Sequence, residues 1–229
     1  MKALVLSSGG LDSTTCVGIA VDKYGKENVA TLSAYYGQKH DKELQCAKQV
    51  AEHYGLPHYE LDLSMIFKSS NNPLLKQSTD EVPEGSYEDQ QKENKQVATY
   101  VPFRNGLLLS AAASFAGSIF PDDEVAILYG AHADDAAGEA YADCSQEFAD
   151  MINSTIKIGT YNRVWIEAPL VAMTKEDVVE KGLELKVPFE LTWSCYKGGE
   201  KQCGKCGTCI DRRKAFTLNG IEDPVGYKE

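Results

Sequence analysis

The sequence lacks any apolar run long enough to span a bilayer, and its first residues show no signal-peptide pattern. We therefore expect a cytoplasmic protein that does not contact membranes. Positive charge is also scarce, because 23 Lys and Arg residues face 34 Asp and Glu residues, which gives a net charge of −11. That balance argues against general binding to nucleic acids or anionic membranes. With 229 residues, 43% of them hydrophobic, the chain can bury one sizeable core and add a small appendage.

Two common nucleotide-binding motifs are absent as well, namely the Walker A pattern G-x-x-x-x-G-K-[ST] and the dinucleotide pattern G-x-G-x-x-G. The chain instead carries Ser8-Gly9-Gly10-Leu11-Asp12-Ser13 between a short apolar run and a helix-like pattern. Glycines allow close approach of a ligand to the backbone, and loop amides at the positive end of a helix dipole form an anion site. A carboxylate repels phosphate, so we expect Asp12 to hold Mg²⁺ against a phosphate group. The simpler alternative is a Gly-Gly turn after a strand.

Apolar segments alternate with helix-like segments along most of the chain. We expect strands at residues 2–6, 29–35, 59–63, 124–129 and 164–168, and helices at 13–24, 41–54, 106–119, from 145 onward and from 175 to about 186. The β-α-β-α-β order predicts an α/β fold, Rossmann-like, with a doubly wound parallel five-stranded sheet. We expect this domain to occupy residues 1–190. A small C-terminal module with a terminal helix would occupy residues 191–229.

Polar residues follow several of the expected strands, at the edge where open α/β sheets bind ligands. His40 follows the second strand, Arg104 opens a helix, and His132, Asp134 and Asp135 follow the fourth strand. Arg104 is suited to bidentate binding of a phosphate or a substrate carboxylate. His132 beside two carboxylates suits a metal site or acid–base chemistry. The alternatives are a surface histidine, a surface arginine, and carboxylates that only cap the next segment.

Residues 68–100 interrupt the alternation of strands and helices. The segment is polar, contains two prolines and includes the charged run at 88–95. A loop of this length without secondary structure is usually functional or disordered. We therefore expect a mobile flap over the site, with a solvated insertion of no consequence as the alternative.

Cysteines gather near the C-terminus, where four of the seven fall within fifteen positions: Cys195, Cys203, Cys206 and Cys209. Disulfides are rare in cytosolic proteins, whereas four thiolates fill the tetrahedral shell of Zn²⁺ and leave no open position. The spacing therefore predicts a structural zinc site. A [4Fe–4S] cluster, which also uses four thiolates, stays an alternative. The other cysteines, Cys16, Cys46 and Cys144, are interpreted as small buried residues.

The residues 8–13 match S-G-G-x-D-S, the PP-loop of the N-type ATP pyrophosphatases, which cleave ATP between the α- and β-phosphates and adenylate a substrate. Together with the cysteine module, this loop resembles the 7-cyano-7-deazaguanine synthase family of the queuosine pathway. The similarity runs from Leu4 to about Arg213. It is carried by the PP-loop through Cys16, Tyr36-Gly37-Gln38-Lys39-His40, Val101-Pro102-Phe103-Arg104-Asn105, Tyr141-Ala142-Asp143-Cys144 and the module from Cys195 to Cys209.

The resemblance implies an adenine nucleotide alpha hydrolase-like fold and an ATP-dependent carbon–nitrogen ligase. ATP would activate 7-carboxy-7-deazaguanine as an acyl-adenylate, and ammonia would displace AMP to give an amide. A second ATP activation would dehydrate the amide to the nitrile. Mg²⁺, one structural Zn²⁺ per subunit and a homodimer go with the family. No direct nucleic-acid partner is expected.

The resemblance also implies where the site residues lie. The ATP site would be formed by Ser7, Ser8, Gly9, Gly10, Leu11, Asp12, Ser13, Thr14, Thr15, Cys16 and Val17. The candidate catalytic residues are Asp12, Ser13, Arg104 and His132, which would hold ATP, the substrate or the metal. Adenylation depends on positioning and electrostatics and requires no activated nucleophile, in agreement with the lack of a Ser-His-Asp signature.

Two other kinds of function fit parts of the sequence. One is another PP-loop adenylating enzyme, such as a tRNA thiolase or an amide synthetase. A thiolase is expected to carry a basic tRNA-binding surface and a catalytic cysteine pair, and the net charge of −11 weighs against the first. The other is a non-catalytic zinc-binding module, which leaves the PP-loop unexplained.

Overall fold

The computed structural model describes residues 1–39, 41–86, 97–137 and 140–228, so His40 and the charged run 88–95 lie outside the described residues. One parallel sheet has the order β3-β2-β1-β4-β5. Its strands are β1 (Lys2–Leu6), β2 (Val29–Tyr35), β3 (His58–Asp62), β4 (Val125–Leu128) and β5 (Val164–Glu167). The prediction of a doubly wound parallel five-stranded sheet is therefore confirmed.

The central strand β1 pairs with β2 on one side and β4 on the other, with Leu4 opposite Ala30 and Ile127. Its residues Ala3, Leu4 and Val5 have no exposed surface. Apolar residues in succession are typical of a parallel strand that is covered on both faces. Leu4 faces one apolar cluster while Ala3 and Val5 face the other, which places a core on each side of the sheet.

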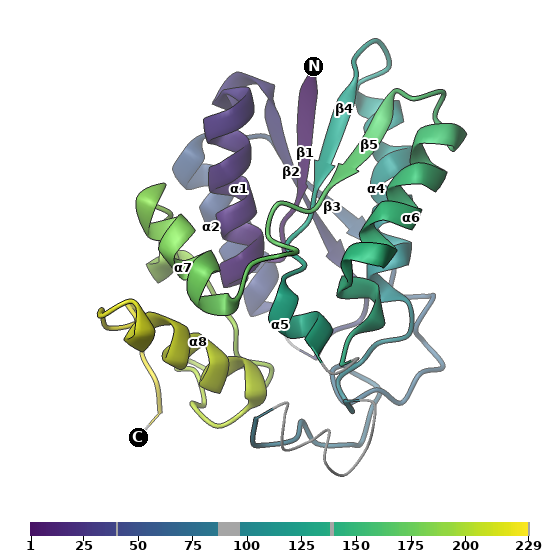
Figure 1. Cartoon of the computed structure of the whole chain (residues 1–229). Coiled ribbons are helices and arrows are strands. Elements are labelled where there is room, and N and C mark those ends of the chain that lie inside the picture. Colours follow the sequence, from purple (N-terminus) through teal and green to yellow (C-terminus); the bar gives the residue numbers. More distant parts are fainter. Residues whose placement is uncertain (40, 87–96, 138–139, 229) are drawn as a thin grey trace.

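Helices cover both faces of the sheet (Figure 1). The helices α1 (Leu11–Tyr24), α2 (Lys42–Tyr54) and α7 (Lys175–Glu184) lie over one face, and α4 (Arg104–Ile119) and α6 (Gln146–Gly159) lie over the other. Shorter helical turns are η1 (Lys26–Asn28), α5 (Ala133–Ala136), η3 (Ala142–Cys144) and η4 (Phe189–Leu191). Among the described residues, no helix has the length and apolar character to cross a membrane.

The C-terminal helix α8 (Gly207–Leu218) packs against α7 at the same end of the molecule as α5 (Figure 1). Phe216 of α8 meets Phe189 edge to face, with ring centroids 5.3 Å apart. Both rings belong to the apolar cluster that also contains α1 and α7 residues. The cysteine module is therefore attached to the α/β domain through a shared core.

Helix α4 begins at Arg104, two residues earlier than the sequence predicts. The preceding residue, Phe103, has a left-handed backbone with φ of 52°, which turns the chain into the helix. A Cβ on Gly106 would lie 2.3 Å from the Phe103 ring, so only glycine leaves room for that ring. The turn makes Arg104 the first helical residue, at the edge of the sheet where ligands bind.

The segment predicted as a flap contains no helix or strand in its described residues, 68–86 and 97–100. It is nevertheless packed: Leu75 and Val82 are buried in a third apolar cluster together with the cysteine module. Leu75 forms a β-bridge with Gln38, and the Gly85 amide donates to the Lys205 carbonyl at 3.0 Å. These contacts join the segment to the module, and movement of a flap stays a prediction.

Candidate functional site

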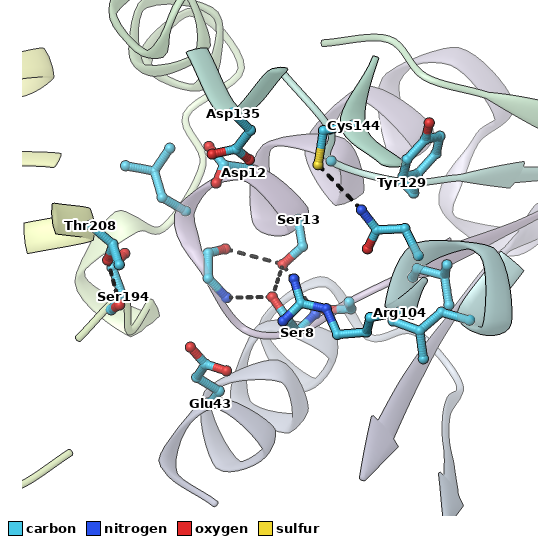
Figure 2. Close-up of a pocket in the computed structure, with 18 of the residues that line it drawn as sticks. Ser8, Asp12, Ser13, Glu43, Arg104, Tyr129, Asp135, Cys144, Ser194 and Thr208 are labelled. Atoms are coloured by element: carbon cyan, nitrogen blue, oxygen red, sulfur yellow. Dashed lines mark hydrogen bonds between the residues drawn. The ribbon is translucent and has the colours of Figure 1, made fainter. Parts of the chain in front are cut away.

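A cavity lies at the carboxyl ends of the strands, where the PP-loop, α2, α4, α5, α7 and the cysteine module converge (Figure 2). Polar and charged side chains line much of it. They are Ser7, Ser8, Asp12, Ser13, Tyr36, Gln38, Glu43, Arg104, Asn105, Tyr129, His132, Asp135, Lys175, Ser194, Tyr196, Thr208 and Asp211. The ends of β1, β2 and β4 therefore contribute to one site, and Lys175 reaches it from the start of α7, as the Rossmann-like topology predicts.

The PP-loop connects β1 to the first turn of α1 and is held in shape by its own hydroxyl groups. The Ser8 amide donates to Ser13 Oγ at 3.1 Å, and the Gly10 amide donates to Ser8 Oγ at 3.3 Å. Ser13 Oγ and Thr14 Oγ1 lie 3.2 and 2.8 Å from the Gly10 carbonyl, to which they donate. These bonds hold a concave loop at the positive end of the α1 dipole, which is a preformed site for phosphate.

Glycine is required in this loop for a steric reason. Gly9 has φ of +81°, and a Cβ built on it would lie 2.1 Å from the Glu43 carbonyl oxygen and 2.5 Å from the Ala47 amide nitrogen. The loop therefore packs directly on the backbone of α2. On the other side, the Gly9 carbonyl accepts a hydrogen bond of 2.9 Å from the amide of Trp193, in the C-terminal part of the chain.

Asp12 lies in the first turn of α1 and is the centre of a network of charged side chains. Both of its carboxylate oxygens lie 2.6 Å from Lys175 Nζ, and His132 Nε2 lies 3.9 Å from one of them. His132 Nε2 is also 3.2 Å from Asp135 and 3.1 Å from Lys175 Nζ. Burial raises the pKa of Asp12, but Lys175 and His132 outweigh this effect and hold it below its ordinary value. Asp12 is therefore ionised and paired with a lysine.

The backbone around this network is also fixed. Gly130, after β4, packs so closely on α1 that a Cβ there would lie 3.0 Å from the Ser13 amide nitrogen. Asp134 accepts a hydrogen bond of 2.7 Å from the Lys175 amide, so its role here is to cap α7. This cap belongs to a helix 41 positions away, not to the next segment that the sequence analysis considered, while Asp135 lies beside His132.

Arg104 points into the cavity from the start of α4 (Figure 2). Its guanidinium lies over the Tyr36 ring, 5.5 Å from the centroid, and donates to the Tyr36 hydroxyl at 3.2 Å. The next residue, Asn105, donates to Cys144 Sγ at 3.3 Å. These contacts hold a cation at the edge of the cavity while leaving further donors of the guanidinium for a ligand.

Glu43 of α2 and residues of the cysteine module complete the wall. Burial raises the pKa of Glu43 to about 7, although the nearby Arg104 opposes the shift. Ser194, Thr208 and Asp211 come from the module and line the same cavity. The site thus contains a carboxyl that is partly protonated near neutral pH, next to a permanent cation.

The four C-terminal cysteines meet in one buried cluster. Their Sγ atoms all lie within 4.8 Å of one another, and Cys206 Sγ is 3.4 Å from Cys209 Sγ. A tetrahedral zinc with Zn–S bonds of about 2.3 Å places its sulfurs about 3.8 Å apart, so these residues fit the ion. Amides of Cys203 and Cys206 donate to neighbouring Sγ atoms at 3.3 Å, as expected for thiolates. In a [4Fe–4S] cluster each thiolate binds a different iron, which would hold the sulfurs farther apart.

Most of the predicted site residues come together. Ser7, Ser8, Gly10, Leu11, Asp12, Ser13, Arg104 and His132 line the cavity. Gly9 lies behind the loop against α2, and Thr14, Thr15, Cys16 and Val17 are buried within α1 and do not line the cavity. Burial raises the pKa of the Cys16 and Cys144 thiols, so both remain protonated at neutral pH.

Sequence reasoning missed three charged residues of the cavity: Glu43, Lys175 and Asp211. A signal for Lys175 was present, because it follows the fifth strand at the start of a helix, and its neighbour Thr174 opens a capping box with Asp177. Only the cap was recognised. Glu43 and Asp211 lie on helices whose inward faces depend on tertiary packing, and the sequence offered no signal for them.

A parallel sheet of this order, with a Ser-Gly-Gly loop that opens α1 beneath the cavity, defines a nucleotide-binding α/β protein of the PP-loop type. The solved NMN synthetase from Francisella tularensis shares the fold, with a TM-score of 0.52 and 14% identity over 96% of this chain and 78% of that one. At that identity the likeness concerns the fold alone.

The sequence profile of the family described as queuosine biosynthesis protein QueC matches residues 2–220, and the chain belongs to this family. The 7-cyano-7-deazaguanine synthase of Caldicellulosiruptor saccharolyticus is 43% identical over 100% of this chain and 96% of its own length. The 7-cyano-7-deazaguanine synthase of Archaeoglobus fulgidus is 40% identical over 98% of this chain and 90% of its own length. The chain is therefore an ATP-dependent enzyme of queuosine biosynthesis, and the predicted family is confirmed.

Proposed function

We propose that the chain converts 7-carboxy-7-deazaguanine and ammonia to 7-cyano-7-deazaguanine, with consumption of ATP. One observation carries the proposal: in a member of this family, a phosphate-binding loop and the half-buried Arg104 line a single cavity. ATP on the PP-loop and a planar acid near Arg104 would then place the α-phosphate next to the carboxylate. Such positioning is the main requirement of an adenylation reaction.

The first step joins the carboxylate to the nucleotide. A carboxylate oxygen of the substrate attacks the α-phosphorus of ATP, and the bond to the β-phosphate oxygen breaks to release pyrophosphate. The loop amides and the Ser8 and Ser13 hydroxyls would hold the phosphate oxygens in the geometry that the PP-loop hydrogen bonds impose. Arg104 would bind the substrate carboxylate through the guanidinium N–H groups that are not bonded to Tyr36.

Two further steps lead to the nitrile. Ammonia attacks the acyl carbon, AMP leaves with the oxygen that links it to the substrate, and a proton is lost to give the amide. The amide oxygen then attacks the α-phosphorus of a second ATP, and the bond to the β-phosphate oxygen breaks to release pyrophosphate. AMP leaves with the former amide oxygen, and loss of the two nitrogen protons completes the C≡N bond. His132 Nε2, between Asp12 and Asp135, is the group we propose to accept such a proton.

Mg²⁺ fits the oxygen-rich corner of the cavity. Asp12 and Asp135 both approach His132 Nε2, at 3.9 and 3.2 Å, so their carboxylates share one small region beside the PP-loop. Carboxylate oxygens together with phosphate are the ligands that this ion prefers. Bound there, the ion would neutralise charge on the phosphates of ATP. The four cysteines would hold a structural zinc.

Several coarser properties complete the proposal. We propose a homodimer in the cytoplasm, as the family resemblance and the composition imply. The boundary between the α/β domain and the cysteine module is proposed near residue 190, within η4. The module would be structural, because its four thiolates face one another and leave no position for a substrate.

A tRNA thiolase is not supported by the two cysteines that line or approach the cavity. Such an enzyme is expected to use a reactive cysteine pair, and a reactive thiol needs a lowered pKa. Burial instead raises the pKa of Cys16 and Cys144. Cys16 has no exposed surface and belongs to the apolar core of α1.

A turnover assay tests the function directly. Purified protein is incubated with Mg-ATP, ammonium and 7-carboxy-7-deazaguanine, and nitrile and AMP are measured by mass spectrometry. We expect both products from the native enzyme and from the Asp122→Ala control, whose residue is exposed and precedes β4, at the end of that strand away from the cavity residue Tyr129. Asp12→Ala should lose both. AMP without nitrile would place the substrate elsewhere, and no AMP from folded, zinc-replete protein would contradict the proposal.

A further inference from the structure

Lys175 is placed at the cavity by two independent anchors. It is the first residue of α7, whose start is fixed by a capping box: the Asp177 amide donates to Thr174 Oγ1, and the Thr174 amide donates to Asp177. Its own amide donates to Asp134 at 2.7 Å. The capping box and the hydrogen bond to Asp134 therefore fix the backbone position of Lys175, from which its side chain extends into the cavity.

The side chain ends beside the PP-loop. Lys175 Nζ lies 2.6 Å from both oxygens of Asp12 and 3.1 Å from His132 Nε2, and the side chain is only 15% exposed. The contact with both oxygens of one carboxylate is the geometry of an ammonium held in an ion pair. Of the described residues around the cavity, Lys175 is the one lysine.

The charge balance of the cavity makes this ammonium important for ATP. Four carboxyl groups line the cavity, from Asp12, Glu43, Asp135 and Asp211, and the protein as a whole carries −11. A nucleoside triphosphate adds about four negative charges at neutral pH, which such a cavity repels unless cations face the phosphates. Arg104 also lines the cavity and is bonded to the Tyr36 hydroxyl. Lys175 is the cation that is bonded directly to a PP-loop residue, Asp12.

We propose that Lys175 is a phosphate-binding residue of the ATP site, held by Asp12 when ATP is absent and transferred to the phosphates when ATP binds. This inference rests on the proposed ATP site and adds a residue to it. The transfer would leave the Asp12 carboxylate free for Mg²⁺, so the same carboxylate would serve first the lysine and then the ion. Figure 2 shows the Asp12 carboxylate close to that of Asp135, and Asp12 precedes Ser13 in the PP-loop, so the Lys175 ammonium already lies beside the loop.

A structural role predicts a different outcome in one specific experiment. If Lys175 only neutralises Asp12, its removal has no effect once Asp12 is already neutral. If Lys175 binds phosphate, its removal weakens ATP binding in both backgrounds. The two roles are therefore separated by a double-mutant cycle with Asp12→Asn, Lys175→Met and the double variant.

The measurement is the dissociation constant of Mg-ATP by calorimetry, without carboxylate or ammonium, so that no turnover occurs. Loss of a charge-assisted contact to phosphate should weaken binding about 10- to 100-fold in Lys175→Met, and by a similar factor when the change is made in Asp12→Asn. Lys175→Arg should retain most of the affinity. Lys181→Met, on the same helix with its ammonium at the exposed Glu184, should bind like the native protein.

Two results would overturn the inference: native ATP affinity in Lys175→Met, or an effect of that change that disappears in the Asp12→Asn background. Zinc content and melting temperature of each variant, compared with Lys181→Met, identify a variant that has failed to fold. In that case Lys175→Arg, which keeps the charge and the packing, is compared with the native protein under the same conditions. The proposed function fails separately, through absence of nitrile from a native enzyme that binds ATP.

Discussion

The PP-loop and the cysteine module use short motifs with glycines in opposite ways. The PP-loop is open: its amides and the Ser8 and Ser13 hydroxyls border a cavity, and its charge partners come from distant elements. The cysteine module is closed: four buried Sγ atoms face one another within 4.8 Å. The first arrangement is suited to a ligand that enters and leaves, and the second to an ion that stays.

The two regions are nevertheless connected. The Trp193 amide bonds to the Gly9 carbonyl at 2.9 Å, and Ser194 and Thr208 of the module line the cavity. Thr208 also donates to the Ser194 carbonyl at 2.5 Å, just beside the cluster. The cysteine module therefore forms one wall of the cavity that we propose as the ATP site. Perturbing the module should affect both regions, whereas perturbing the loop should affect only one.

The largest effect is expected from Cys206→Ser. Loss of one thiolate removes a ligand from a closed zinc site, and structural zinc sites contribute several kcal/mol to folding. We expect loss of bound zinc by elemental analysis, a clearly lower melting temperature and weaker ATP binding. Cys46→Ser, a buried cysteine outside the cluster, should keep its zinc. Native ATP affinity in zinc-free, folded Cys206→Ser would show that the module does not support the loop.

Gly9→Ala should break the loop and leave the module intact. The new Cβ would overlap the Glu43 carbonyl oxygen, and φ of +81° adds strain, so the loop must move. We expect ATP affinity to fall more than about tenfold, equivalent to about 1.4 kcal/mol, with native zinc content. Gly55→Ala is the matched control, since Gly55 has φ of +70° but no atom within 4 Å of its Cβ position. Equal effects of the two changes on ATP binding would exclude the steric explanation.

The substitution Arg104→Met tests whether this residue binds the carboxylate of the acid substrate. Loss of a charge-assisted contact to a carboxylate should raise the KM of the acid substrate about 10- to 100-fold, while Mg-ATP binding changes much less. Steady-state kinetics with each substrate varied in turn separates these effects. Arg163→Met, whose guanidinium bonds to backbone carbonyls near β4 and outside this cavity, is the control. An equal loss for both substrates would contradict a role in binding the acid.

The last prediction concerns the free energy of unfolding, and its size depends on whether Glu43 is protonated. Its pKa is about 7 in the folded protein against an ordinary value of 4.5, so the folded state binds the proton more tightly. The stability that this proton contributes is present below pH 4.5 and is lost as the pH rises through about 7. Glu43→Gln should therefore raise the free energy of unfolding by about 2 kcal/mol at pH 8 and have little effect near pH 4.5.

Denaturant melts at the two pH values provide the measurement for Glu43→Gln. Glu52→Gln, on an exposed position of the same helix, should show no such difference between pH 4.5 and pH 8. Destabilisation of Glu43→Gln at pH 8 would mean that the carboxylate is stabilised in the cavity, contrary to the expected sign.

The sequence was informative wherever structure depends on near neighbours. Apolar runs placed β1 and β2 at their observed bounds, and the spacing of four cysteines identified the metal cluster before any geometry was known. Strand β3 is shifted by one residue, because the pairing partner decides where an edge strand begins. Arg104 begins α4 because Phe103 takes a left-handed turn, which no local pattern indicated.

The network of charged residues around Asp12 could not be predicted from the sequence, for a different reason. Asp12 and Lys175 are separated by 163 positions, and only the sheet order brings the ends of β1 and β5 to one cavity. Asp12 was therefore assigned to a metal, and its lysine partner was noticed only as a neighbour of a helix cap. Likewise, nothing in the cysteine spacing indicated that the module would form a wall of the ATP site.

The most direct test of the account follows oxygen atoms through the reaction. 7-carboxy-7-deazaguanine labelled with ¹⁸O in both carboxylate positions is turned over with Mg-ATP and ammonium, and AMP is analysed by mass spectrometry. Adenylation of the acid and then of the amide predicts two AMP molecules per nitrile, each carrying one ¹⁸O atom. Unlabelled AMP, with the ¹⁸O recovered in pyrophosphate, phosphate or water, would contradict the proposed chemistry.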